Sequence, residues 1–320
     1  MITLQHAYIL GGLFFLALAL LSLRDTANNK RLRNAGFWGL VSLSFLAGDV
    51  IGDLGNGVLS LGLVAIAAFG LGESKPPTTT PAERIESATR RGNALFLPAL
   101  IIPAAALIGT LIVKQTAFGA AFIEPRNATL VSLVLGVLIA VGVAMIWFKP
   151  PMLAPLQEGR RLMDSVGWAA LLPQMLASLG AVFLAAGVGE QVGRVFGEFL
   201  PLEGRTIAVA AYCIGMALFT IIMGNAFAAF PVMTAAIGLP ILVHEFGGDP
   251  ARICAIGMLA GFCGTLMTPM AANFNVVPAN LLELPDRKNA LNGVIRAQIP
   301  TAIPLLFANI LLMRFLAFPS

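Results

Sequence analysis

Long apolar runs separated by short polar and basic loops fill most of this chain. A membrane-spanning helix needs about 20 mainly apolar residues. Ten runs approach that length, although several fall short of it: Ala7–Leu23, Phe37–Ile51, Gly57–Leu71, Ala94–Val113, Ala128–Phe148, Val166–Val188, Thr206–Met223, Ala226–Val243, Ile253–Met267 and Ala297–Phe315. The pattern predicts an all-α polytopic membrane protein with roughly ten hydrophobic segments.

The composition agrees with a lipid bilayer as the environment of the chain. Of its 320 residues, 58% are hydrophobic and only 11% are charged, whereas soluble domains carry about 25% charged residues. The first run has no basic residue before it and no A-x-A site after it, so we expect a retained helix and not a cleaved signal peptide. The net charge of +4 gives no sign of nucleic-acid binding, because the basic residues lie in short loops between the runs.

The distribution of Lys and Arg predicts an orientation in the membrane. Basic residues gather in the loop after the first run (Arg24, Lys30, Arg31 and Arg33), in Lys75–Gly92, in Lys149–Asp164 and in Arg287–Arg296. Cytoplasmic loops carry an excess of Lys and Arg. We therefore expect these loops in the cytoplasm, the N-terminus outside, and a multi-pass protein of a cell membrane, the bacterial inner membrane.

Two loops divide the chain. Lys75–Ala82 is a Pro/Thr-rich linker, and after Lys149–Asp164 helix-breaking residues begin to interrupt the apolar runs. The sequence predicts four parts: N-terminal helices with an Asp-containing hairpin (1–92), connecting helices (93–165), a hairpin and broken-helix transport unit (166–284) and a C-terminal helix (285–320).

Three stretches place polar residues and helix breakers inside apolar surroundings: Leu171–Gly193, Ile221–Pro240 and Gly261–Glu283. Irregular backbone is tolerated at membrane depth only where protein or a water-filled cavity surrounds it. The end of a broken helix offers N–H groups to an anion or carbonyl groups to a cation. Secondary transporters build substrate and ion sites in this way near the bilayer midplane, so we expect broken, unwound helices at the midplane here.

The residues at these interruptions are the candidate substrate-binding residues: Ser178, Gly180, Gly224, Asn225, Thr268 and Asn273. Asn225 follows Gly224 and can cap the next helix or bind substrate directly. The alternative for all of them is structural, because kinks and hydrogen bonds between helices are common in membrane proteins.

Asp49 and Asp53 lie four residues apart in the stretch AGDVIGDLGNG, on one face if that stretch is helical. Ionisable residues inside a membrane point to function. We therefore count both with Asn225 and Thr268 as candidates for coupling to an ion. The alternative, which the sequence DLGNG resembles, is the solvated turn of a helical hairpin.

The sequence gives no support to a metal site, another cofactor or an enzyme. Its three cysteines lie scattered in apolar runs and it has two histidines, so we expect no metal site. His244-Glu245 lacks the second histidine of a zinc-protease helix, since position 248 is Gly. No P-loop motif is present. The one cofactor expected is a coupling ion, H⁺ or Na⁺.

Three stretches carry a resemblance to known proteins: AGVGEQVG, MGNAFAAFPVMTAA and TLMTPMAANFNVVPANLLELPD. The chain resembles the ion transporter superfamily, which includes gluconate, C4-dicarboxylate and citrate carriers. It is most similar to the larger-subunit family of the two-component 5-oxoproline (pyroglutamate) transporter. The resemblance implies a secondary carrier for a small anionic substrate, working with a second, smaller membrane subunit.

The superfamily resemblance also implies paired inverted repeats, of which this chain shows one clear copy, Val166–Glu283. We therefore expect a second membrane subunit, or a second copy of this chain, to supply the other. Two alternatives are a non-transporting structural or assembly subunit and an intramembrane enzyme, the latter less favoured.

Overall fold

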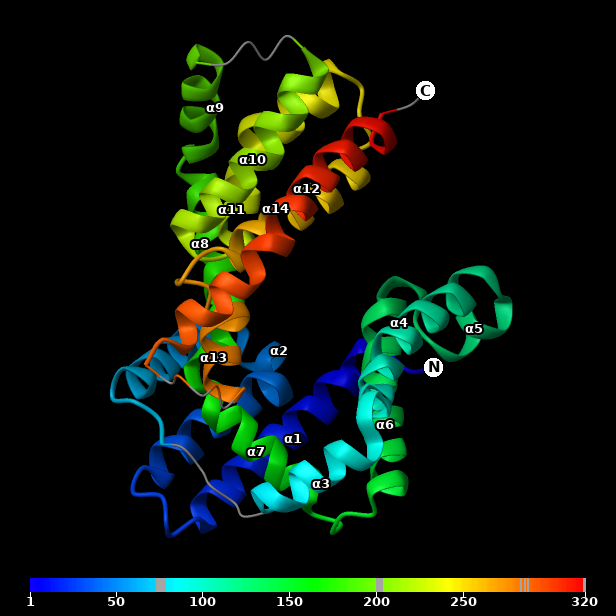
Figure 1. Cartoon of the computed structure of the whole chain (residues 1–320), viewed down its shortest axis with the longest axis vertical. Helices are drawn as coiled ribbons and strands as arrows, with labels where there is room; N and C mark the ends of the chain where they lie inside the picture. Colours follow the sequence, from blue (N-terminus) through cyan, green and yellow to red (C-terminus); the bar gives the residue numbers. More distant parts are fainter. Residues whose placement is uncertain (73–78, 200–203, 283, 285, 287, 319–320) are drawn as a thin grey trace. The chain divides into compact units, whose positions relative to one another are not determined.

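The computed structural model describes residues 1–72, 79–199, 204–282, 284, 286 and 288–318. The chain divides into two compact units, Met1–Gly167 and Trp168–Ser320, each of which is built from helices (Figure 1). Much of the predicted linker Lys75–Ala82, including Lys75, lies outside the described residues, as do Glu283 and Arg287. The unit boundary is close to the predicted boundary at 165/166, and the other parts predicted from the sequence are not units of their own.

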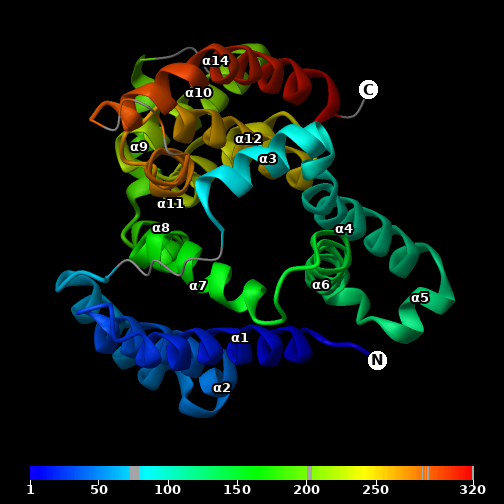
Figure 2. The ribbon, with the colours of Figure 1, turned by 60° about the horizontal axis from the view of Figure 1, so that its bottom comes forward.

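Unit 1 contains two pairs of long helices and three shorter helices. The elements are α1 (Leu4–Arg24), α2 (Arg31–Ala68), α3 (Pro81–Arg91), α4 (Leu97–Gln115), α5 (Ala117–Phe122), α6 (Ala128–Phe148) and α7 (Ala154–Val166). Figure 2 shows α1 beside α2 and α4 beside α6. Small residues allow the close approach of the second pair: a Cβ added to Gly136 of α6 would lie 3.1 Å from the carbonyl oxygen of Ile102 in α4.

Helix α2 is a helical hairpin. Gly52 has φ 64° and ψ −174°, a combination that is essentially restricted to glycine. The two ends of α2 come together, because Arg33 Nη1 donates to the carbonyl oxygen of Phe69 at 2.6 Å. Asn34 exchanges hydrogen bonds with the backbone of Gly72. The segments before and after Gly52 are therefore antiparallel, as the hairpin interpretation of DLGNG implies.

Unit 2 packs its helices around a buried core that includes Tyr212, Met216 and Ile237. Its elements are α8 (Leu172–Ala185), α9 (Val188–Phe199), α10 (Arg205–Met223), α11 (Ala226–Met233), a first π-helix (Thr234–Glu245), α12 (Pro250–Leu266), a second π-helix (Ala272–Val276), α13 (Val277–Leu281) and α14 (Ala290–Leu316).

The close contacts of unit 2 define the directions of its helices. Gly257 and Gly264 of α12 lie against Tyr212 and Thr220 of α10, so these two helices are parallel. The α14 residues Asn309 and Met313 contact Cys263 and Cys213, respectively. Helix α14 is therefore antiparallel to both, and this packing joins α14 to the rest of unit 2.

Helices α8 and α9 do not form a hairpin. Gly180 of α8 lies against Phe227 and Pro231, Gly189 of α9 lies against Val232 and Ala235, and Gly193 lies against Ala236. The contacts advance together along both segments, so α8 and α9 run in one direction, parallel to α11 and the first π-helix. Gly187, with φ 70°, joins the two helices. A hairpin at Leu171–Gly193 is thus replaced by a kinked column of α8 and α9.

The protein is a multi-pass helical membrane protein by helix length and composition. Seven stretches of the described residues are long and apolar enough to span a bilayer: Leu4–Arg24, Arg31–Ala68, Ala82–Gln115, Pro125–Phe148, Arg205–Met223, Ala226–Glu245 and Ala290–Leu316. Two of the ten predicted segments, Phe37–Ile51 and Gly57–Leu71, are the arms of the α2 hairpin. Two others correspond to helices shorter than a full span, α8 with 14 residues and α12 with 17.

Candidate functional site

The turn between α10 and α11 is buried and tightly packed. Gly224 ends α10 with φ 79°, and its N–H donates to the carbonyl oxygen of Thr220 at 2.7 Å. A Cβ on Gly224 would lie 2.7 Å from Cβ of Met270, so neither the backbone angle nor the space admits another side chain. Asn225 is only 9% exposed, and its Oδ1 accepts from the N–H of Phe227 at 2.8 Å. Asn225 is therefore the N-cap of α11.

Thr268 joins this turn to the end of α12. Its hydroxyl donates to the carbonyl oxygen of Ile221 at 2.9 Å and accepts from the N–H of Met270 at 3.3 Å. Ile221 lies in the last turn of α10, where carbonyl groups have no partner within the helix. Thr268 is 1% exposed, so it supplies a hydrogen bond where water cannot.

Asn275 is a site residue that the sequence interpretation missed. It is fully buried, and its Nδ2 donates to the carbonyl oxygens of Thr265 at 2.9 Å and Thr268 at 2.7 Å. Its Oδ1 is buried without a hydrogen-bond partner among the described residues, as is Oγ1 of Thr220. Native proteins leave few such atoms unsatisfied. We define Thr220, Gly224, Asn225, Thr268 and Asn275 as the polar layer of unit 2.

Two apolar stretches end at the polar layer of unit 2. Helices α10 and α12 both end there, and each stretch that meets at Gly224–Asn225 is long enough to span by itself, with 19 and 20 residues. Beside α14 the layer lies between Asn309, which contacts Cys263, and Gln298, which donates to Phe274 at 3.2 Å.

The polar layer is therefore near the midpoint of the 27-residue α14. Taken alone, this places the layer near the middle of the bilayer. However, the first part of α14 carries the polar residues Asn292, Arg296 and Gln298, and its apolar part begins at Ile299. The apolar lengths determine which part of a helix lies in hydrocarbon, and they favour a position near the ends of the spans. The midplane position expected from the sequence stays a prediction.

The other sequence-predicted site residues do not join the layer. Gly180 packs against α11, where an added Cβ would lie 3.2 Å from the carbonyl oxygen of Phe227. Ser178 on α8 and Asn273 on the second π-helix are exposed. Asp49 and Asp53 are exposed on either side of Gly52 in unit 1. The structure thus brings together Gly224, Asn225 and Thr268 of the predicted set.

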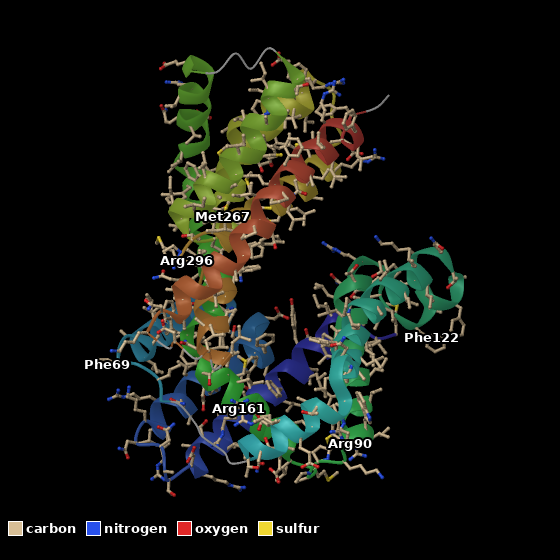
Figure 3. The ribbon with its side chains drawn as sticks, in the orientation of Figure 1. Phe69, Arg90, Phe122, Arg161, Met267 and Arg296 are labelled. Carbon is tan, nitrogen blue, oxygen red and sulfur yellow. The ribbon has the colours of Figure 1, made fainter. Side chains whose placement is uncertain are left out.

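A cavity of about 550 Å³ opens at the N-terminal end of α14. Its lining includes Asp286, Asn289, Asn292 and Arg296, and Figure 3 labels Arg296 together with Met267, where α12 has just ended. Hydrogen bonds from the side chain and backbone N–H of Asn289 hold the pKa of Asp286 below its ordinary value. Arg296 lies on the half of α14 that contacts the second π-helix, so the cavity is on the polar side of the layer.

The polar layer contains groups that attract cations and groups that attract anions. The C-terminal ends of α10 and α12 present carbonyl groups and negative dipole ends, which attract cations. The unpaired oxygens of Asn275 and Thr220 add two further groups that can accept. The N-terminus of α11 presents N–H groups that attract anions. Among the described residues, no group of His, Cys, Asp and Glu gathers in a way that could hold a metal ion.

Comparison with known proteins gives one match. The family described as "Protein of unknown function (DUF979)" matches residues 5–318, almost the whole chain. No curated protein and no solved structure matches it.

Proposed function

Because the chain belongs to the DUF979 family, whose description assigns no activity, we propose from its own geometry that it is the membrane subunit of a secondary transporter. The substrate is a small organic acid, with 5-oxoproline as the candidate that the sequence resemblance supplies, coupled to H⁺ or Na⁺. The bacterial inner membrane is the proposed location. The chain itself catalyses no chemical reaction in this proposal.

The polar layer of unit 2 carries the proposal. It combines one helix N-terminus with two helix C-termini in a space of a few residues, so an anion and a cation can be held close together. Such a pair is what a carrier for an organic acid must bind when it couples uptake to a cation. The unpaired oxygens of Asn275 and Thr220 support the cation half of the site.

The cavity beside the layer supplies an approach for the substrate. Arg296 is exposed and lines the cavity, and a basic side chain there attracts a carboxylate. Lys288 and Arg296 belong to the C-terminal basic region, which the positive-inside rule assigns to the cytoplasm. The layer is then the cytoplasmic end of the transport path, and Asn225 and Thr268 become accessible when the turns at Gly224 and Met270 move apart.

In this proposal a second polypeptide covers the break in the helices at the turn after α12. Met270, in the turn after α12, is 62% exposed although it lies beside buried polar backbone. Lipid in contact with irregular backbone would leave groups unsatisfied. A second membrane subunit is favoured over a second copy at this place, because the resemblance is to a two-component transporter.

A structural or assembly subunit is the competing function, and one observation favours it. Thr268 and Asn275 already use their donors to cap helix ends, which a purely structural layer would also require. The two functions differ in what the unpaired oxygens do: a carrier binds a ligand there, and a scaffold does not.

Uptake of radiolabelled 5-oxoproline separates these possibilities. Cells without their own 5-oxoproline transport would express the chain alone, or with its candidate partner subunit. We expect uptake with the pair, and loss of uptake in Asn225→Ala and Thr268→Ala at unchanged membrane insertion. Asn280→Ala, on the exposed part of α13, is the control and should transport normally. Normal uptake by both layer variants would refute the site, and absence of uptake by the unaltered pair would refute the substrate.

A further inference from the structure

Three buried side-chain oxygens of unit 2 have no hydrogen-bond partner among the described residues: Thr220 Oγ1, Asn275 Oδ1 and Gln298 Oε1. No buried side-chain nitrogen of unit 2 is in that state within the same part of the chain. An amide oxygen can only accept, and a hydroxyl oxygen keeps a lone pair for a cation even when it donates. The unmet requirement at these atoms is therefore for a donor or a cation, and not for an anion.

Hydrogen bonds fix the orientation of both amide groups. Nδ2 of Asn275 donates to the carbonyl oxygens of Thr265 at 2.9 Å and Thr268 at 2.7 Å. Nε2 of Gln298 donates to the carbonyl oxygen of Phe274 at 3.2 Å. Turning either amide over would place its oxygen against a carbonyl oxygen, where neither atom can donate. The amide oxygens are therefore held as the acceptors that still require a partner.

Thr220 and Asn275 contact neighbouring positions at the end of α12. A Cβ added to Gly261 would lie 3.4 Å from Thr220 Oγ1, and one added to Gly264 would lie 2.9 Å from Thr220 Cβ. Asn275 bonds to the carbonyl oxygen of Thr265, the residue after Gly264. Positions 261, 264 and 265 share one face of a helix because they are three and four residues apart. Both side chains therefore lie where α10 and α12 end, and the negative dipole ends of these helices attract a cation.

The stretches that build the polar layer contain no charged residue. Residues 206–243 and 253–282 have no Asp, Glu, Lys, Arg or His. Their titratable side chains are Tyr212, Cys213, Cys254 and Cys263, which are ordinarily uncharged near neutral pH. A proton has no carboxylate or imidazole to bind in these stretches. Protein sites for Ca²⁺ and Mg²⁺ draw on carboxylates, so uncharged oxygens favour a monovalent metal ion.

The cavity beside the polar layer does not supply a proton carrier either. Asp286 lines it, and the hydrogen bonds from Asn289 hold the pKa of its carboxyl group below the ordinary value. This carboxylate therefore stays ionised near neutral pH. Arg296, the basic residue that lines the same cavity, stays protonated at every working pH. Neither charge changes in the range where a proton-coupled carrier operates.

We propose that the coupling ion is Na⁺, bound by the uncharged oxygens Thr220 Oγ1 and Asn275 Oδ1 where α10 and α12 end. The carbonyl groups that end the two helices are ligands of the same kind. This inference rests on the proposed carrier function, and it adds the identity of the ion and two of its ligands. The bound Na⁺ strengthens the attraction of the polar layer for an anion at the N-terminus of α11, so ion and substrate bind cooperatively.

Thermal unfolding of the purified protein without substrate tests the ion directly. The midpoint is measured against increasing NaCl, with choline chloride and KCl at matched ionic strength, at a mildly acidic and a mildly basic pH. Na⁺ should raise the midpoint saturably, because it binds the folded protein and not the unfolded chain. The Na⁺ concentration at half saturation should be the same at both pH values. Equal midpoints in all three salts would overturn the proposal, as would stabilisation by K⁺ in place of Na⁺ or half saturation that shifts with pH.

Substitutions of Thr220 assign the site. Thr220→Val removes an oxygen that bonds to no described residue and keeps the branched shape, so the variant should fold. It should require about tenfold more Na⁺ or more for half saturation, the loss of one ligand. Thr220→Ser keeps the oxygen and should restore most of the response. Thr301→Val, at an exposed position of α14, is the control. A Thr220→Val protein that responds to Na⁺ like this control would overturn the proposed ligand.

The result is separable from the carrier function itself, because no substrate is present. Binding of 5-oxoproline by a protein that does not respond to Na⁺ would refute the ion and leave the carrier function standing. A saturable Na⁺ response that Thr220→Val weakens, in a protein that neither binds nor transports 5-oxoproline, would confirm the ion site and refute the proposed substrate.

Discussion

Two glycine turns, one in each unit, show how the same backbone device serves different surroundings. Gly52 turns α2 back on itself, and Gly224 joins α10 to α11; both have positive φ. In each turn an Asn secures the backbone. Asn56 Nδ2 donates to the carbonyl oxygens of Gly48 and Gly52, each at 2.9 Å, and Asn225 accepts from Phe227.

The two turns differ in what surrounds them. A Cβ on Gly52 would meet nothing within 4 Å, and the neighbouring Val50 and Leu54 are 88% and 85% exposed. A Cβ on Gly224 would collide with Met270, and Thr268 and Asn275 complete hydrogen bonds that water makes elsewhere. An exposed turn needs only the right backbone angles, whereas a buried turn needs a dedicated side chain for each freed carbonyl group. That is why a polar layer is present in unit 2 and absent from the described part of the α2 turn.

Among the substitutions that compare the two turns, Asn275→Leu is expected to lower the stability of the protein most. It removes two hydrogen bonds. The buried carbonyl oxygen of Thr265 loses its side-chain donor, at about 1–3 kcal/mol, and that of Thr268 keeps only the N–H of Ala271 at 3.4 Å. The thermal unfolding midpoint of the detergent-solubilised protein should fall by several degrees. Asn280 is exposed, so Asn280→Leu should leave the midpoint unchanged. If both variants lowered the midpoint equally, burial of Asn275 would not account for its effect.

Gly224→Ala comes next. The added methyl group meets Met270, which costs about 1–3 kcal/mol by overpacking, and a left-handed alanine adds about 1–2 kcal/mol. Thermal unfolding of this variant can be compared with that of Gly57→Ala, where the added Cβ meets nothing within 4 Å. Gly57→Ala should be neutral or slightly stabilising, because alanine favours helix. A Gly224→Ala protein as stable as this control would contradict the close packing of the layer.

Gly52→Ala should have a smaller effect than Gly224→Ala, although its backbone angles are the more demanding. The strain of this conformation is about 1–3 kcal/mol, but the open surroundings let the turn relax. The measured loss of stability should therefore lie in the lower part of that range. A larger loss than that of Gly224→Ala would reverse the comparison and would indicate that the α2 turn is covered in the membrane.

Asp49→Asn and Asp53→Asn should have the smallest effect on stability. Both side chains are exposed, and substitutions at such surface positions usually change stability by less than about 0.5 kcal/mol. Their role in ion coupling stays a prediction, which the dependence of uptake on Na⁺ and on pH measures. An unchanged ion dependence in the double variant would remove them from the coupling site.

The sequence was informative about the helices and the turns, and less so about the side chains inside the layer. Gly224-Asn225 and Thr268-Pro269 stand out because they interrupt apolar runs, and both interruptions are found together in unit 2. Asn275 could not be separated from Asn273, since they lie two residues apart and a π-helix changes which of them faces inward. Thr220 sits within an apolar run, where a threonine hydroxyl commonly bonds its own helix.

The depth of the helix breaks in the membrane and the directions of the helices on either side were harder to predict than the positions of the breaks in the sequence. A Gly-Asn pair in an apolar run is equally compatible with a break at mid-membrane and with a turn between two spans. Only the pairing of α10 with α11 and the first π-helix distinguishes the two. Likewise, Gly187 is compatible with a hairpin or a kink, and the backbone contacts of Gly189 and Gly193 decide for the kink.

Binding of 5-oxoproline to the purified protein, measured by titration calorimetry in Na⁺ and in choline buffers at two pH values, tests the central claim most directly. The account predicts saturable binding that is weakened when the coupling ion is withdrawn. It also predicts that Asn225→Ala and Thr268→Ala abolish this binding while Asn280→Ala preserves it. Undiminished binding by both layer variants, folded as judged by their thermal unfolding, would contradict the assignment of the polar layer as the binding site.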